Sequence, residues 1–247
     1  MSSLRDHFER VRATRTTMKD TARAAAVTAR DTQTQTDFEG VSAEAVNLEL
    51  KFFNDQEQLN AISSRIARNE KKAALLKSYI PYIEGVLAAG VSPQNDLLLV
   101  LMVWLLDTQG LALATDIAQF ALLNDMVMPE PFSRDVACVF AEQFSEEVIK
   151  NAATPSPETA KRALDLVSDY DMPDEVRAKL YRAYGLSVLD VDKQAAISAY
   201  ETALKLDASV GVKNELARLK KSMGAAFVDE VDAQAQNEAG ADTDTPA

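Results

Sequence analysis

The chain has 247 residues, with 26 basic and 38 acidic side chains and a formal net charge of -12. It contains one histidine, His7, and one cysteine, Cys138. These counts argue against histidine-rich metal sites and histidine-based triads, and they leave no partner for an intrachain disulfide. A lone cysteine also suits a reducing, cytoplasmic compartment. Eight glycines and eight prolines favour helices over a turn-rich β architecture, so we predict an all-α protein.

The N-terminal region, residues 1–37, is basic in an otherwise acidic chain. A helix over residues 4–30 gathers six basic side chains on one stripe, beside an apolar edge that includes Leu4, Phe8, Val11 and Met18. The stripe consists of Arg5, Arg12, Arg15, Lys19, Arg23 and Arg30. Two interpretations stay open, which are contact with nucleic-acid phosphates and the solvated face of an ordinary helix. A membrane-surface helix is a third, but its edge is rich in alanine. Residues 32–37 predict a linker.

Residues 38–90 predict a long central helix with a coiled-coil-like seam. Apolar side chains alternate at spacings of four and three from Leu48 to Ile83, with Asp55 and Asn69 as polar exceptions. Pro81 should end or kink this helix. The seam either mediates self-association or packs within its own domain. The candidate oligomerisation residues are Leu48, Phe52, Leu59, Ile62, Ile66, Asn69 and Leu76.

Residues 91–153 predict a compact helical core. The apolar run from Leu97 to Leu106 is shorter than the roughly 20 residues that span a bilayer, so it indicates a buried helix. The N-terminus lacks the apolar segment of a signal peptide, and we expect no membrane partner. Aromatic side chains at Trp104, Phe120 and Phe140 should lie in the core. One face of a later helix carries Val136, Val139, Phe140, Phe144 and Val148.

Residues 154–223 predict a second module of short paired helices. Tyr181, Tyr184 and Gly185, followed by Ala196, Tyr200, Ala203 and Asp207, approximate a tetratricopeptide-like hairpin in which small residues let two helices approach. Such a module could bind a protein partner. Residues 224–247 carry six acids and no basic side chain, which predicts a disordered acidic tail.

No motif predicts a reaction. Residues 85–92 have the glycine spacing of a phosphate loop but lack its lysine, and Glu49 and Lys51, with Asp37 upstream, fall in a helical stretch unlike a nuclease core. The weak catalytic candidates are Asp171, Asp174 and Glu175, which could hold magnesium but also suit the start of a helix. We therefore expect no metal site and no cofactor, with magnesium only if the chain is a nuclease.

Several blocks nevertheless resemble a known family when taken together. They are Tyr79 to Leu87, Trp104 to Thr108, Ala121-Leu122 with Met128-Pro129, and Asp171 to Leu180, supported by residues 211–213. In this order they resemble the terminase small subunits of tailed bacteriophages that package cohesive-ended DNA, often labelled terminase endonuclease subunits. The resemblance covers about residues 1–223 and is most specific at Asp171 to Leu180.

The resemblance implies a role in viral DNA packaging in the host bacterial cytoplasm. Such a subunit binds the packaging-initiation site on double-stranded phage DNA, joins the terminase large subunit and assembles into a homo-oligomeric ring. It implies that the basic stripe contacts DNA, with a reserve cluster at Arg65, Arg68, Lys71, Lys72 and Lys77. We place phosphodiester cleavage in the large subunit. The alternatives are that this chain is itself the endonuclease, or that it is a helical adaptor that does not bind DNA.

Overall fold

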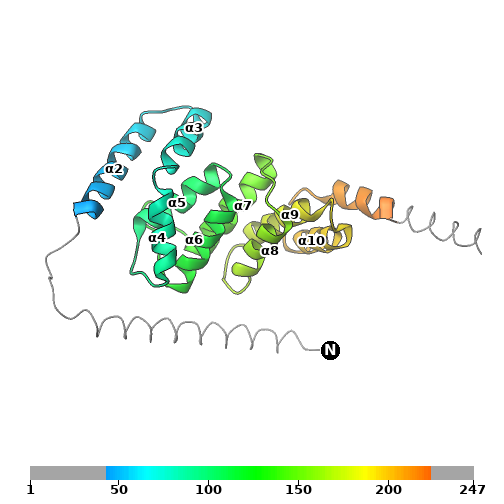
Figure 1. Ribbon diagram of the computed structural model, residues 1–247. Helices are drawn as coiled ribbons and strands as arrows, with labels where there is room; N and C mark the ends of the chain where they lie inside the picture. The colour runs from blue at the N-terminus through cyan, green and yellow to red at the C-terminus, as the bar shows by residue number, and fades with distance from the viewer. Residues whose placement is uncertain (1–42, 224–247) are drawn as a thin grey trace, which may run out of the picture. The chain divides into compact units, whose positions relative to one another are not determined.

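The computed structural model describes residues 43–223, and all regular structure in this range is helical, with no strand (Figure 1). The predicted all-α class is therefore confirmed for these residues. The predicted basic helix with its six stripe residues, the linker at 32–37 and the acidic tail at 224–247 lie outside the described residues.

The described helices divide between two compact units, residues 1–143 and 144–247, with the boundary inside α7. The five regions expected from the sequence stay a prediction. The helices are α2 (Ala43–Asn60), α3 (Arg65–Leu76), α4 (Ile80–Ala89), α5 (Asp96–Asp107), α6 (Leu111–Leu123), α7 (Val136–Lys150), α8 (Pro157–Leu166), α9 (Asp174–Val188) and α10 (Lys193–Leu206), and residues 213–223 are also helical.

The prediction of a single long helix over residues 38–90 is wrong, because the described part of this stretch, residues 43–90, contains the three helices α2, α3 and α4. After α2, the Ser64 hydroxyl caps α3 by accepting from the Ala67 N–H at 3.4 Å. The Arg68 guanidinium donates to the carbonyl of Ile62 at 2.6 and 3.2 Å, which satisfies a backbone group left free by the break. Pro81 stands in the first turn of α4, where proline is tolerated.

The core of the first unit is built around α5 and α6. Helix α5 is buried on nearly every side, including Leu98, Met102 and Trp104, and the Asn95 side chain caps it by accepting from the Leu98 N–H at 3.0 Å. A helix that is apolar all round belongs in a core, and the buried helix predicted at Leu97 to Leu106 is confirmed. Among the described residues, no helix is long and apolar enough to cross a membrane.

Helix α7 buries Val136, Val139, Phe140, Phe144 and Val148, as the sequence predicts. Phe120 and Trp104 are also buried, so the three aromatic core assignments are confirmed.

The chain leaves α7 through Ala152 in the left-handed conformation, with φ of 52°. Its neighbour Ala153 donates its N–H to the Glu147 carbonyl at 3.0 Å, which closes the helix end. A Cβ makes this conformation costly. Ala152→Gly should therefore raise the free energy of unfolding by about 1 kcal/mol, measured by urea denaturation.

The matched control for this change is Ala74→Gly, at an exposed position inside α3. There the same substitution should lower the free energy of unfolding by about 1 kcal/mol. Equal signs for the two variants would contradict the role assigned to Ala152.

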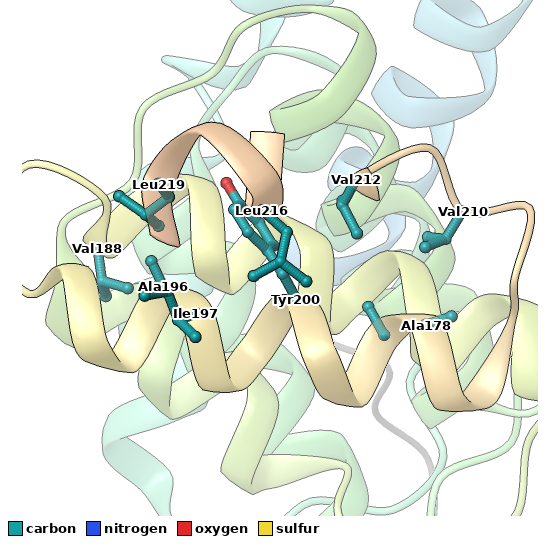
Figure 2. Close-up of a cluster of buried hydrophobic side chains, with 10 residues drawn as sticks. Ala178, Val188, Ala196, Ile197, Tyr200, Val210, Val212, Leu216 and Leu219 are labelled. Carbon is teal, nitrogen blue, oxygen red and sulfur yellow. The ribbon is translucent and has the colours of Figure 1, made fainter. Parts of the chain in front are cut away.

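The second unit contains a hairpin of α9 and α10, closed by the last helix at residues 213–223. Its core gathers Ala178 and Val188 from α9, Ile197 and Tyr200 from α10, and Leu216 from the last helix (Figure 2). Gly185 faces Tyr200 so closely that a Cβ there would lie 2.4 Å from Cε1 of the ring. The small residue therefore sets how near the two helices approach, as the sequence predicts for this hairpin.

The Tyr200 hydroxyl is buried at the edge of this core without a hydrogen-bond partner among the described residues. The Arg182 Nε and Glu215 Oε2 atoms are also buried and unpartnered there, while Arg182 Nη1 donates to the Val210 carbonyl at 2.8 Å. Burial raises the pKa of Tyr200 to about 12, with the Glu215 carboxylate adding to the rise and Arg182 opposing it.

Tyr200→Phe should therefore leave the free energy of unfolding unchanged at neutral pH, or raise it by up to about 1 kcal/mol, because it removes an unsatisfied polar group. The native state keeps the Tyr200 proton more firmly than the unfolded chain. Stability is thus present below the ordinary tyrosine pKa of about 10 and falls as pH rises above it. The variant should lose less stability than the parent between pH 10 and the folded pKa of about 12.

The comparison for Tyr200→Phe is Tyr79→Phe, in which the lost hydroxyl does have a partner. This second variant should lower stability at neutral pH by about 1 kcal/mol. Thermal unfolding of both at pH 7 gives the sign directly, and a loss for Tyr200→Phe would contradict the prediction.

Candidate functional site

A buried carboxylate, Asp55, joins α2 to the rest of the first unit. It is 6% exposed and accepts from the Tyr79 hydroxyl at 2.7 Å and from Lys51 Nζ at 2.6 Å. Gln58 contributes a longer contact at 3.4 Å. A buried charge is tolerated when its partners satisfy it, so this cluster holds α2 in one position.

Tyr79, which donates to Asp55, also contacts two other aromatic rings, those of Phe52 and Trp104. The Phe52 ring centroid lies 5.4 Å from that of Trp104 and 6.1 Å from that of Tyr79, and Tyr79 meets Trp104 edge-on at 6.2 Å. Lys51 Nζ lies 3.9 Å from the centre of the Tyr79 ring. Burial, followed by the hydrogen bond from Tyr79 to Asp55, raises the pKa of the Tyr79 hydroxyl well above its ordinary value. The hydroxyl therefore stays protonated and donates to Asp55, which ties α2 to the chain at Tyr79.

Helix α3 is fixed to the end of α5 by polar contacts. Asn69 Nδ2 donates to the Asp107 carbonyl at 2.9 Å, and Lys72 pairs with the Asp107 carboxylate at 2.5 Å. Both polar exceptions of the predicted seam, Asp55 and Asn69, thus make contacts within the chain.

The predicted oligomerisation residues do not form one continuous surface. Leu59 and Leu76 are buried by this chain's own packing, whereas Ile66 is 75% exposed. Leu48, Phe52, Ile62 and Asn69 are half-buried. The break between α2 and α3 interrupts the predicted seam. Self-association through these residues therefore stays a prediction.

Sequence reasoning missed a different apolar face on α2. Leu50 and Phe53 are each 59% exposed, three residues apart on the side of α2 that turns away from Asp55 and Leu59. The three-residue spacing of Leu50 and Phe53 is visible in the sequence. The apolar 4-3 alternation, however, follows the opposite side of the helix, which is buried.

The reserve basic cluster on α3 is partly engaged in the fold. Arg68 donates to a backbone carbonyl and Lys72 pairs with Asp107, while Lys71 is half-buried and Lys77 is exposed. Arg65 is exposed and has an interaction of its own. These residues are therefore not gathered on one free surface.

The carboxylates considered for magnesium lie at the start of α9. Asp171, Asp174 and Glu175 are all exposed, and the last two occupy the first turn, where a helix favours negative charge. Within residues 43–223, no group of three histidine, cysteine or acidic side chains is placed to hold a metal ion. Lys51, considered with Glu49 and Asp37 for a nuclease core, is instead paired with Asp55 in α2.

The block from Asp171 to Leu180 owes its form to a loop. The Arg177 guanidinium donates to the carbonyls of Ser168 and Tyr170, so it fixes the chain between α8 and α9. Met172 and Val176 are buried on either side of the helix start. Met172, Val176 and Arg177 therefore serve packing and backbone hydrogen bonding in this block.

Comparison with known proteins shows which family the chain is similar to. Residues 49–175 match the family model described as the phage small terminase subunit. The chain is 36% identical over 178 residues to a protein of Escherichia phage P2 named "Terminase, endonuclease subunit", covering 70% of this chain and 72% of that relative. No solved structure matches the chain. With a family match over half of its length and a relative of this identity and coverage, the chain belongs to the phage small terminase subunit family and serves in phage DNA packaging.

Proposed function

We propose that this chain binds the packaging-initiation, or cohesive-end, site on concatemeric phage DNA and directs the terminase large subunit to cut and package it. The observation that carries the proposal is family membership, shown by the match over residues 49–175. The basic stripe of residues 5–30 supports it from the sequence, because lysine and arginine side chains supply phosphate contacts. Such contacts give affinity and position the protein, but they carry no base information.

The partners in this proposal are double-stranded phage DNA, the terminase large subunit and further copies of the chain in a ring. The setting is the host bacterial cytoplasm. The tetratricopeptide-like module, residues 154–223, is part of the same proposal as a site for a protein partner.

The first test is a gel of labelled DNA carrying the cohesive-end site, run with magnesium and without the large subunit. Full-length chain should retard the DNA without cutting it, and a version lacking residues 1–37 should not retard it. An unshifted gel with the full-length chain would favour the adaptor alternative, in which the helical hairpins bind a protein and the stripe is solvated.

A salt titration sharpens this test. Replacing Arg12, Arg15, Lys19 and Arg23 with alanine should lower the slope of log affinity against log salt by up to about 3.6, since each phosphate contact contributes about 0.9. A matched variant removes the same charge at four exposed lysines of the second unit, Lys193, Lys205, Lys213 and Lys221. Its slope should equal that of the parent, and equal losses in both variants would argue against the stripe.

A second candidate function is cleavage by this chain itself, favoured by the name of the phage P2 relative. Purified chain would then cut DNA with magnesium, and replacing Asp171, Asp174 or Glu175 would abolish cutting. Cutting that survives all three replacements would place the nuclease centre elsewhere in the chain. Uncut DNA at every magnesium concentration would leave cleavage to the large subunit.

A further inference from the structure

We propose that the last helix of the second unit, residues 213–223, is a detachable cover, which leaves the α9–α10 hairpin while the hairpin itself stays folded. Detachment uncovers the side of the hairpin that carries Ile197 and Tyr200, so the second unit has a covered and an uncovered state. The inference concerns the motion of one helix, and it holds whether or not the chain binds DNA.

The cover is held to the hairpin by a small set of apolar side chains. Val212 just before it, and Leu216 and Leu219 within it, are buried in the core of the hairpin. Figure 2 shows Leu216 and Leu219 directed toward α10. The other side of the cover meets solvent, where Asn214 and Arg218 are exposed. A helix of this kind owes most of its stability to the packing of one face, so a cover that leaves the hairpin also unfolds.

Buried polar groups at the same junction oppose this contact. Across the described residues, three side-chain atoms are buried without a hydrogen-bond partner, and they are Arg182 Nε on α9, Tyr200 Oη on α10 and Glu215 Oε2 on the cover. Burial raises the pKa of Tyr200, Glu215 adds to the rise and Arg182 opposes it, so both charges lie near this hydroxyl. A buried polar atom without a partner costs free energy, which water restores when the cover detaches. The three atoms therefore favour the uncovered state.

The segment between α10 and the cover supplies a hinge with one fixed end. Arg182 Nη1 donates to the Val210 carbonyl at 2.8 Å, which ties this segment to α9. The next residue, Gly211, has a φ of 86°, a conformation that a residue with a Cβ rarely adopts. Since a few loop residues are enough to absorb the backbone rotation of a hinge, rotation at Gly211 moves the cover while Val210 stays in place.

The far end of the cover is held only by an exposed ion pair. Lys220 Nζ lies 2.5 Å from Glu201 Oε1 on α10, and the two side chains are 51% and 43% exposed. Water and salt screen such a pair, so it contributes little to docking. The hairpin, by contrast, is held by the close approach of Gly185 to the Tyr200 ring. The cover is therefore the element of this core that we expect to leave first.

The test is hydrogen exchange on the full-length chain, followed by mass spectrometry at increasing urea concentration. In the parent, amides of residues 216–219 should exchange at least about tenfold faster than those inside α9 and α10. Their exchange should also respond less steeply to urea, because the opening of one helix exposes less surface than the unfolding of the whole unit. Equal rates and equal urea dependence in α9, α10 and the cover would overturn the proposal.

Glu215→Gln decides whether the buried polar atoms drive the opening. It should slow the exchange of residues 216–219 by at least about fivefold, because the covered state no longer buries an unpaired carboxylate oxygen. The matched control is Glu201→Gln, the same chemical change at the exposed ion pair with Lys220. It should speed the exchange by less than about fivefold, since a weak favourable contact is lost.

The direction of the change is the sharpest outcome. Unchanged or faster exchange in Glu215→Gln would overturn the proposal, and so would faster exchange in Tyr200→Phe. In either case the polar atoms at the junction would not oppose the cover, and faster exchange would show that they hold it in place, for example through a bridging water.

Discussion

Replacing Gly185 with alanine is expected to lower the free energy of unfolding by about 3 kcal/mol. The added Cβ would lie 2.4 Å from Cε1 and 2.7 Å from Cδ1 of Tyr200, well inside van der Waals contact. The ring cannot easily move away, because Tyr200 is fully buried among Ala196, Ile197 and Leu216. The hairpin must therefore open or Tyr200 must leave its position. Urea unfolding followed by far-ultraviolet circular dichroism measures the loss.

The control for Gly185→Ala is Gly85→Ala, because Gly85 lies inside α4 with nothing within 4 Å of an added Cβ. That change should raise stability by about 0.5 to 1 kcal/mol through helix propensity alone. Combining Gly185→Ala with Tyr200→Leu should recover part of the loss, since the smaller side chain vacates the space. If Gly185→Ala unfolds at the same urea concentration as the parent, the assigned close approach is incorrect.

Replacing Asp55 with alanine should cost about 3 kcal/mol in the first unit. The change strands the buried Tyr79 hydroxyl, which loses its acceptor, and it leaves Lys51 without its ion-pair partner. Unfolding can be followed by the fluorescence of Trp104, the one tryptophan of the chain, whose ring meets that of Tyr79 at 6.2 Å.

The chain offers a matched control for this loss in the pair Lys161 and Asp165. It has the same i,i+4 spacing and an N–O distance of 2.5 Å, but the Asp165 side chain is 60% exposed against 8% for Asp55. Asp165→Ala should therefore change stability by less than about 1 kcal/mol. Similar losses for the two variants would show that spacing, rather than burial, sets the contribution of Asp55.

The fold class and the buried helices could be predicted because their signals are local. The run from Leu97 to Leu106 is apolar on all sides, and α7 repeats its valines and phenylalanines at helical spacing, so burial followed from pattern alone. Ser156 followed by Pro157 predicts the start of a helix, and α8 does begin at Pro157. The Ser156 hydroxyl caps it by accepting from the Thr159 N–H at 3.1 Å.

The division of residues 38–90 was missed because apolar spacing alone does not reveal a break between helices. The 4-3 alternation continues across residues 61–64, although Ser63-Ser64 carries a cap signal of its own. The break between α2 and α3 leaves the carbonyl of Ile62 without a helical partner. This carbonyl accepts from the guanidinium of Arg68, six residues later in the chain. Likewise, the pairing of Asn69 with Asp107 joins residues 38 positions apart, which no local periodicity could indicate.

The hairpin of α9 and α10 has a consequence for how fragments of this protein would behave. The family match ends at Glu175, the second residue of α9, so it stops before Gly185 and before every residue of α10. A polypeptide cut to residues 49–175 would keep α8 but lose the helix that α8 packs against, exposing Ala160 and Ala163 to water. The limits of the family match are therefore not the limits of the packed second unit, and a fragment that keeps this core must run through at least Leu219.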